Sequence, residues 1–175
     1  MTNTALYAAF EQAVPGFSAQ DIITPALDES HGEYKQIYWL DDLLTENFIC
    51  YIEWKEFDLR DLEALIPIKQ AGIALSIDSL FDEQGFPIGD ITPEEFFYDA
   101  SGFYLPVLQQ QLQQAELQLL EVGLLQNGDV YLHENPRFIC TTTAKDKVDQ
   151  LNQCLQQRGC LLYTSPSPRD TERSR

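Results

Sequence analysis

An Asn127-Gly128 pair between two apolar runs is the feature that most restricts what this chain can fold into. The run Leu119–Leu125 precedes the pair and the run Val130–His133 follows it. Asn-Gly supplies the two positive φ angles of a type I′ turn, whose twist suits antiparallel strands. The run Phe138–Thr142 then predicts a third strand. The sequence therefore predicts a three-stranded antiparallel meander in its C-terminal third.

Helical and strand patterns alternate before this meander. Leucine and isoleucine spacing predicts helices, and short β-branched or aromatic runs predict strands at Phe48–Trp54 and Ile73–Ile77. The order predicts an α+β fold with a mostly antiparallel sheet and helices packed mainly on one face. Residues 1–159 have the length of a single domain. The predicted helices cover 4–14, 34–45, 58–66, 92–101, 106–115 and 144–155, and the glutamine-rich side of 106–115 is expected to face solvent.

Acidic residues dominate the charge of the chain. Asp and Glu number 28 against 11 Lys and Arg, which gives a formal net charge of −17. Nucleic acids and anionic membranes bind proteins through Lys and Arg, so this balance disfavours both as partners. It favours a basic protein as partner. The N-terminal sequence has no signal-peptide pattern and no window approaches eighteen apolar residues, so we expect a cytoplasmic protein.

The interval Asp78–Tyr104 combines acids with aromatic residues. It contains seven acids and seven aromatics, and the chain has no Lys or Arg between Lys69 and Arg137. Acids steer the association of proteins and aromatic side chains supply buried anchors. We therefore expect this interval to be the partner-binding surface. The candidate residues are Asp82, Glu83, Asp90, Glu94, Glu95, Tyr98 and Asp99.

Motifs for cofactor or covalent chemistry do not occur in the sequence. The three cysteines before residue 160 lack the paired spacing of zinc ligands, and Cys50 and Cys140 sit in apolar runs typical of buried thiols. His31 lies in a predicted loop, far in sequence from His133, and is expected to be solvated. We expect no cofactor and no metal.

A strand-borne acid-x-Lys pair gives an enzymatic alternative. Glu53 and Lys55 lie on one face of the strand that ends at Trp54, and Asp41 and Asp42 lie upstream. Metal-dependent phosphodiesterases and nucleases use such a pair to hold Mg²⁺ and steady an oxygen. The alternative site comprises Asp42, Glu53 and Lys55, with Asp41 as a substitute for Asp42.

The same segment carries a family resemblance. Tyr34–Gly72, with FICYIEWKE at positions 48–56 between two helices, resembles a small acidic bacterial domain family with no established function. It is similar in style to the immunity proteins found beside bacterial toxins, which are small, acidic and single-domain. The resemblance implies a non-enzymatic inhibitor of a basic toxin and implies no functional residue. A DNA-mimic inhibitor, with carboxylates spaced like phosphates, is the third hypothesis.

The last sixteen residues carry a second resemblance, which implies that they do not belong to the natural protein. Residues 160–175 read CLLYTSPSPRDTERSR, which resembles the translation of a sequencing-library adapter. The resemblance implies that the natural C-terminus is missing after Gly159. We therefore expect Cys160–Arg175 to contribute nothing to the fold and to form an exposed coil from about Ser165.

Overall fold

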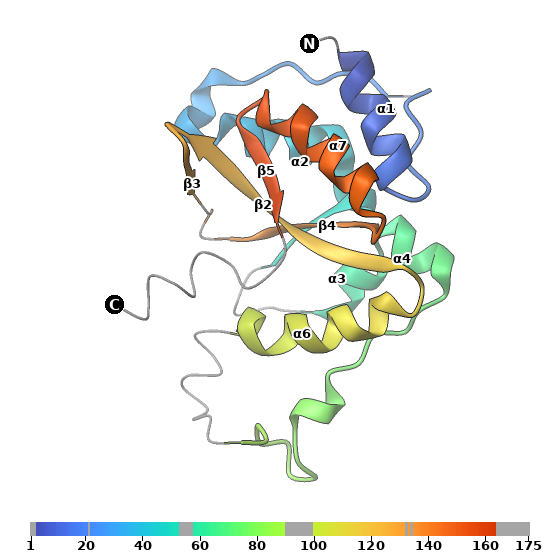
Figure 1. Ribbon diagram of the computed structural model, residues 1–175. Coiled ribbons are helices and arrows are strands. Elements are labelled where there is room, and N and C mark those ends of the chain that lie inside the picture. Colours follow the sequence, from blue (N-terminus) through green and yellow to red (C-terminus); the bar gives the residue numbers. More distant parts are fainter. Residues whose placement is uncertain are drawn as a thin grey trace.

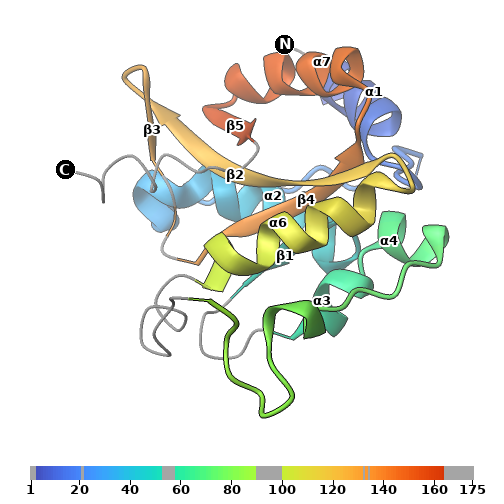
Figure 2. The ribbon, with the colours of Figure 1, turned by 60° about the horizontal axis from the view of Figure 1, so that its bottom comes forward.

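The fold is described from a computed structural model of the chain. The structure describes residues 3–20, 22–52, 58–89, 100–131, 133 and 135–163, without the side chains of 100–102. Within these ranges the chain forms six α-helices and an antiparallel sheet of five strands, which confirms the predicted α+β class. The sheet lies between two layers of helices (Figures 1 and 2).

The long strand β2 (Leu117–Gln126) organises the sheet. Asn127 and Gly128 have φ angles of 53° and 90°, as the predicted type I′ turn requires, and the chain returns as β3 (Asp129–Tyr131). After a break it continues as β4 (Arg137–Thr142), which also pairs with β2 and then with β1 (Ile49–Tyr51). β5 (Cys160–Tyr163) pairs with the middle of β2, and Glu121 and Leu124 each have one partner in β5 and a second partner in β4 or β3. β3 and β4 therefore follow one another along the edge of β2 opposite β5 and do not pair with each other in the predicted meander order.

The break between β3 and β4 is a four-residue excess on one side of the ladder. Leu124 pairs with Tyr131 and Glu121 pairs with Phe138, so two residues of β2 face six residues of the returning chain. The described residues between the two strands, His133, Asn135 and Pro136, belong to no strand, and we call the connection 132–136 the bulge. This bulge contains His133 and leads directly into Arg137.

The first face of the sheet is covered by three helices, α1 (Asn3–Ala13), α2 (Lys35–Phe48) and α7 (Lys145–Gln156). Each helix buries an apolar stripe at helical spacing. Phe10 of α1, Leu40 of α2 and Leu151 of α7 are fully buried against Ile139 and Val122 of the sheet. These residues form the larger of two cores.

The opposite face is covered by α3 (Leu59–Glu63), α4 (Ile66–Ala71) and α6 (Ala100–Gln113). Leu62, Ile68 and Leu108 pack here against Phe138 and Cys140. The prediction that helices pack mainly on one face is therefore wrong. Side chains of alternate strand residues are apolar on both faces, and both faces need a cover.

The segment Ile73–Ile77 is not the predicted strand. No described strand pairs with it, and the carboxamide of Gln111 in α6 instead bonds both backbone groups of Ser76, at 2.9 Å to N and 2.6 Å to O. Gln109 bonds the N–H and the C=O of Leu119 on β2 in the same way. The prediction that the glutamines of 106–115 face solvent holds for Gln110, Gln113 and Gln114, which are exposed, and is wrong for Gln109 and Gln111. These last two side chains act as substitutes for a neighbouring strand.

Cys160–Tyr163 forms a strand, β5, and corrects the expectation that this tail contributes nothing. Gly159 has a φ of 77° and ends the α7 turn, so the chain reverses and does not prolong the helix. Cys160 and Leu162 then alternate into the larger core, while Asn152 bonds both backbone groups of Leu162. β5 occupies the edge of β2 opposite β4. The expected coil from Ser165 lies outside the described residues.

Candidate binding surface

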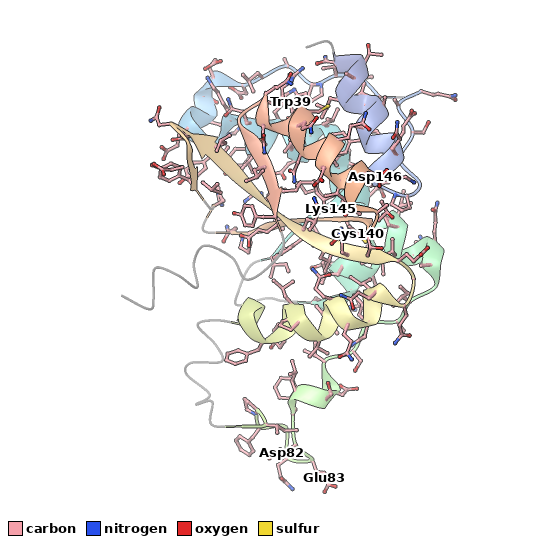
Figure 3. The ribbon with its side chains drawn as sticks, in the orientation of Figure 1. Trp39, Asp82, Glu83, Cys140, Lys145 and Asp146 are labelled. Atoms are coloured by element: carbon pink, nitrogen blue, oxygen red, sulfur yellow. The ribbon has the colours of Figure 1, made fainter. Side chains whose placement is uncertain are left out.

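A small hairpin, Phe81–Ile88, stands away from the body of the protein. It follows a 3-10 turn at Asp78–Leu80, and Figure 3 shows its residues Asp82 and Glu83 at the far end from the sheet. Phe81 and Pro87 form an antiparallel bridge that closes its base. The N–H of Ile88 donates to the carbonyl of Leu80 at 2.9 Å and holds the base to the 3-10 turn.

Asp82 fixes the shape of this hairpin. Its Oδ1 accepts hydrogen bonds from the N–H groups of Gln84 and Phe86, both at 2.9 Å. Its backbone N–H donates to the Phe86 carbonyl at 2.8 Å, and Gly85 takes a positive φ of 84° at the turn. Aspartate favours such turns because its carboxylate replaces a backbone acceptor. Asp82 therefore shapes the surface.

The hairpin exposes apolar side chains beside an acid. Phe86 is 61% exposed and Ile88 is 57% exposed, and Glu83 is exposed at the tip. Single exposed apolar residues are common on proteins, but here two lie close in sequence on one turn that hydrogen bonds hold in shape. Aromatic anchors next to charge are typical of protein-binding surfaces.

The predicted partner-binding residues are only partly covered by the described chain. Asp82 and Glu83 lie together on the hairpin and are exposed. Of the aromatic residues in the same interval, Phe86 is exposed, whereas Phe81, Phe103 and Tyr104 are half-buried. The remaining candidates lie outside the described residues: Asp90, Glu94, Glu95, Tyr98 and Asp99.

The described structure contains only one residue of the enzymatic alternative site. Asp42 is exposed on α2, and Glu53 and Lys55 lie outside the described residues. Asp41, the substitute for Asp42, is hydrogen-bonded to Arg137. Within the described ranges no group of three or more His, Cys, Asp or Glu side chains could hold an ion.

A polar cluster at the bulge between β3 and β4 was not foreseen from the sequence. Arg137 is only 6% exposed, and its Nε and Nη2 donate to the Asp41 carboxylate at 3.1 to 3.4 Å. Its Nη1 donates to the carbonyl of Asn135 at 2.8 Å and to Nδ1 of His133 at 3.0 Å. The Asn135 N–H donates to the same Nδ1, so the proton of neutral His133 is on Nε2. Arg137 thus ties the bulge to α2.

Aromatic rings surround this cluster. The Arg137 guanidinium lies 5.4 Å from the Tyr38 ring centroid and 5.7 Å from that of Tyr51. His31 stacks on Tyr38 at 4.2 Å, and His133 contacts the same ring edge-on at 6.1 Å. The two histidines, distant in sequence, therefore meet at one tyrosine. The ring of Tyr34, which directly precedes α2, also contacts His133 edge-on at 4.7 Å. Only the helical spacing of Tyr34, Tyr38 and Asp41 could have indicated such a cluster from the sequence.

Burial dominates the electrostatics of the cluster. Partial burial raises the pKa of Asp41 more than its hydrogen bonds to Arg137 lower it. The carboxylate therefore carries a desolvation cost, and the guanidinium offsets part of it. Burial also raises the pKa of Cys50 and of Cys140 to about 12, which fits the predicted buried thiols.

The fold and this surface define an acidic α+β protein with a projecting, hydrogen-bonded hairpin. Comparison with protein-family models found no match, and comparison with curated proteins and with solved structures found no significant match. Within the described residues, no helix combines the length and the apolar character needed to cross a membrane.

Proposed function

We propose that this protein is a non-enzymatic binding domain that docks a basic protein through the hairpin Phe81–Ile88. The observation that carries the proposal is the exposure of Phe86 and Ile88 on a turn held by the Asp82 hydrogen bonds. A rigid turn loses little conformational entropy on binding, so its apolar contacts contribute more to affinity. The acidic character of the chain supplies attraction to a positively charged partner.

The distribution of basic residues supports a basic partner over an acidic one. No Lys or Arg occurs between positions 69 and 137, so the hairpin has no cation near it in the sequence. A basic partner would meet Glu83 at the tip and be steered by the net charge of −17. Neutralisation of a bacterial toxin, as the immunity-like resemblance implies, is the biological role that fits this chemistry.

A binding screen with matched variants tests the proposal. The probes are a panel of purified basic nuclease toxins, with acidic proteins of similar size as controls. We expect at least one basic protein to bind, with an affinity that falls as salt is raised. Phe86→Ser should weaken binding at least tenfold, whereas Ile23→Ser, which changes a 90% exposed apolar residue elsewhere, should not.

Charge reversal separates steering from contact. Glu83→Lys and Glu33→Lys change the net charge equally, but only Glu83 lies on the hairpin. We expect Glu83→Lys to slow association more than Glu33→Lys does. Equal effects of the two reversals together with full binding by Phe86→Ser would show that the hairpin is not the docking surface.

A further inference from the structure

The strand β1 presents one edge of the sheet to a cavity. Its other edge pairs with β4, and no described strand pairs with the edge that faces away. The N–H of Ile52 donates to the carbonyl of Pro136, beside β4, at 2.9 Å. Backbone groups alternate sides along an antiparallel strand, so Cys50 also bonds toward β4. Ile49 and Tyr51 therefore point their backbone groups outward.

Most of these outward-pointing backbone groups are available for hydrogen bonding to an added strand. The Ile49 N–H already donates to the carbonyl of Thr45, which ends α2. The Ile49 carbonyl and the Tyr51 N–H have no hydrogen-bond partner among the described residues, and the Tyr51 carbonyl accepts only a weak bond from the Cys50 thiol at 3.5 Å. An extended chain placed along this edge could bond all three groups.

The space beside this edge is large enough for a bound segment. A cavity of about 440 Å³ lies between β1 and the helices α3 and α4, within the size range of ligand sites. Glu46 at the end of α2 and Asp61 of α3 line it, together with Lys69 of α4. Two carboxylates against one ammonium leave the lining net negative. A positively charged occupant therefore fits it better than an acidic one.

A strained backbone residue lies next to the lining of the same cavity. Thr45 has φ 55° and ψ 175°, a conformation that residues with a Cβ rarely adopt. The strained residue directly precedes Glu46 and Asn47, which both line the cavity. Its conformation breaks α2 and lets the chain enter β1 with this edge facing the cavity. Strain of this kind concentrates at binding sites.

Another unpaired edge of the sheet, on β2, differs from the β1 edge because a side chain blocks it. Leu119 of β2 also directs its backbone groups away from β4, and there the Gln109 carboxamide occupies both of them. Proteins commonly block sheet edges in this way to prevent unwanted pairing. In the described structure no side chain does the same for Ile49 and Tyr51 of β1.

We propose that the β1 edge binds an extended, basic peptide segment of a partner protein, which adds to the sheet as a sixth strand. Backbone hydrogen bonds to Ile49 and Tyr51 would hold the segment, and its Lys or Arg side chains would meet Glu46 and Asp61. This site lies on different elements from the hairpin Phe81–Ile88. The inference therefore stands independently of the docking role proposed for that hairpin.

The test uses a synthetic peptide as the probe. It is a seven-residue peptide of alternating lysine and valine, acetylated and amidated at its ends, and binding is followed by amide hydrogen exchange. We expect the Tyr51 N–H to exchange at least tenfold more slowly with millimolar peptide. A peptide of alternating glutamate and valine should give no protection. Two N-methylated lysine–valine peptides, one methylated on the odd-numbered amides and the other on the even-numbered amides, should also give none, because N-methylation removes the N–H groups that pair with a strand.

Two substitutions at one position give a matched control. Tyr51→Ala removes the ring and keeps the outward N–H, whereas Tyr51→Pro also removes the N–H without disturbing the bonds to β4. Because Tyr51→Pro has no N–H at this position to exchange, the affinities of both variants are measured by isothermal titration calorimetry. We expect Tyr51→Ala to bind the lysine–valine peptide and Tyr51→Pro to bind it at least tenfold more weakly. If Tyr51→Pro does not fold, the N-methylated peptides decide the question. The weakest dissociation constant that we expect for such a segment is about 5 mM. The proposal would be overturned if 5 mM peptide gave the Tyr51 N–H no protection, or if the N-methylated peptides bound as well as the unmethylated one.

Discussion

The ion pair between Arg137 and Asp41 offers the sharpest test of how this fold is held together. The Arg137 side chain is 7% exposed and that of Asp41 is 28% exposed, so water reaches the carboxylate more easily than the guanidinium. Removing either partner leaves the other partly desolvated. The two single substitutions should therefore differ in cost, and the order of the costs follows from burial.

Replacing Asp41 by Leu should be the more damaging change. It leaves a buried guanidinium that cannot lose its proton, and we expect a loss of about 4 kcal/mol in the free energy of unfolding. Replacing Arg137 by Met removes its bonds to Asp41, His133 and Asn135. We expect a loss of about 3 kcal/mol, because the carboxylate can take up water or a proton.

The double variant and the pH dependence distinguish the energy of the ion pair from the separate effects of changing each residue. Asp41→Leu with Arg137→Met replaces the pair by apolar groups and should cost about 2 kcal/mol, less than the sum of the singles. Because the folded-state pKa of Asp41 is raised, the penalty of its carboxylate is absent below the unfolded-state pKa, grows as pH rises from there, and is fully present above the folded-state pKa. The cost of Arg137→Met should therefore shrink toward pH 4, while that of Asp41→Leu should not.

Urea unfolding with linear extrapolation provides the measurement. Arg60→Met is the matched control, since Arg60 also bonds an aspartate, Asp58, but its side chain is 85% exposed. We expect that control to change stability by less than about 0.5 kcal/mol. Equal effects of Arg137→Met and Arg60→Met, or a double variant whose cost equals the sum of the singles, would refute the assignment of a buried, coupled pair.

Three further predictions follow from packing. Gly123→Ala should cost about 2 kcal/mol in urea unfolding, because a Cβ there would lie 2.7 Å from the Tyr163 ring and 2.8 Å from Cγ1 of Val130, and a Tyr163→Ala background should relieve only the part of that cost that comes from the ring. The Cys50 and Cys140 thiols should resist Ellman's reagent at pH 8 until urea unfolds the chain, and rapid labelling of these thiols in the native protein would contradict this. The free energy of unfolding should also fall as pH rises from 9 toward 12, because the thiols ionise more easily in the unfolded state. Truncation after Gly159 should lower stability by about 3 kcal/mol through the loss of buried Cys160 and Leu162, and an unchanged melting temperature would show that β5 contributes nothing.

Local signals in the sequence were sufficient for much of the secondary structure. The Asn127-Gly128 turn was predicted because its dihedral angles depend on those two residues alone. The helices α1, α2 and α7 were predicted because their apolar stripes repeat at helical spacing. The α+β class followed from the order of these elements.

Predictions that depended on distant partners were less successful. Ile73–Ile77 has strand-like composition, but Gln111 occupies the backbone groups of Ser76 that a strand would have paired. The tail at 160–163 resembles an adapter translation and still fits the sheet. Its Cys160 and Leu162 alternate correctly for a core that β2 and α7 create. A short segment cannot indicate which edge or cavity will be next to it.

For the candidate sites, the sequence determined the chemistry and the tertiary structure decided the positions. Acid content and the interval without Lys or Arg, read from the sequence, favoured a basic partner. That Phe86 is exposed whereas Phe81 is half-buried depends on how the hairpin stands on the body. The meeting of Asp41 with Arg137, 96 positions apart, and the outward edge of β1 depend on strand order and on the bulge. Such contacts are set by the packing of whole elements, and a local pattern of residues does not contain them.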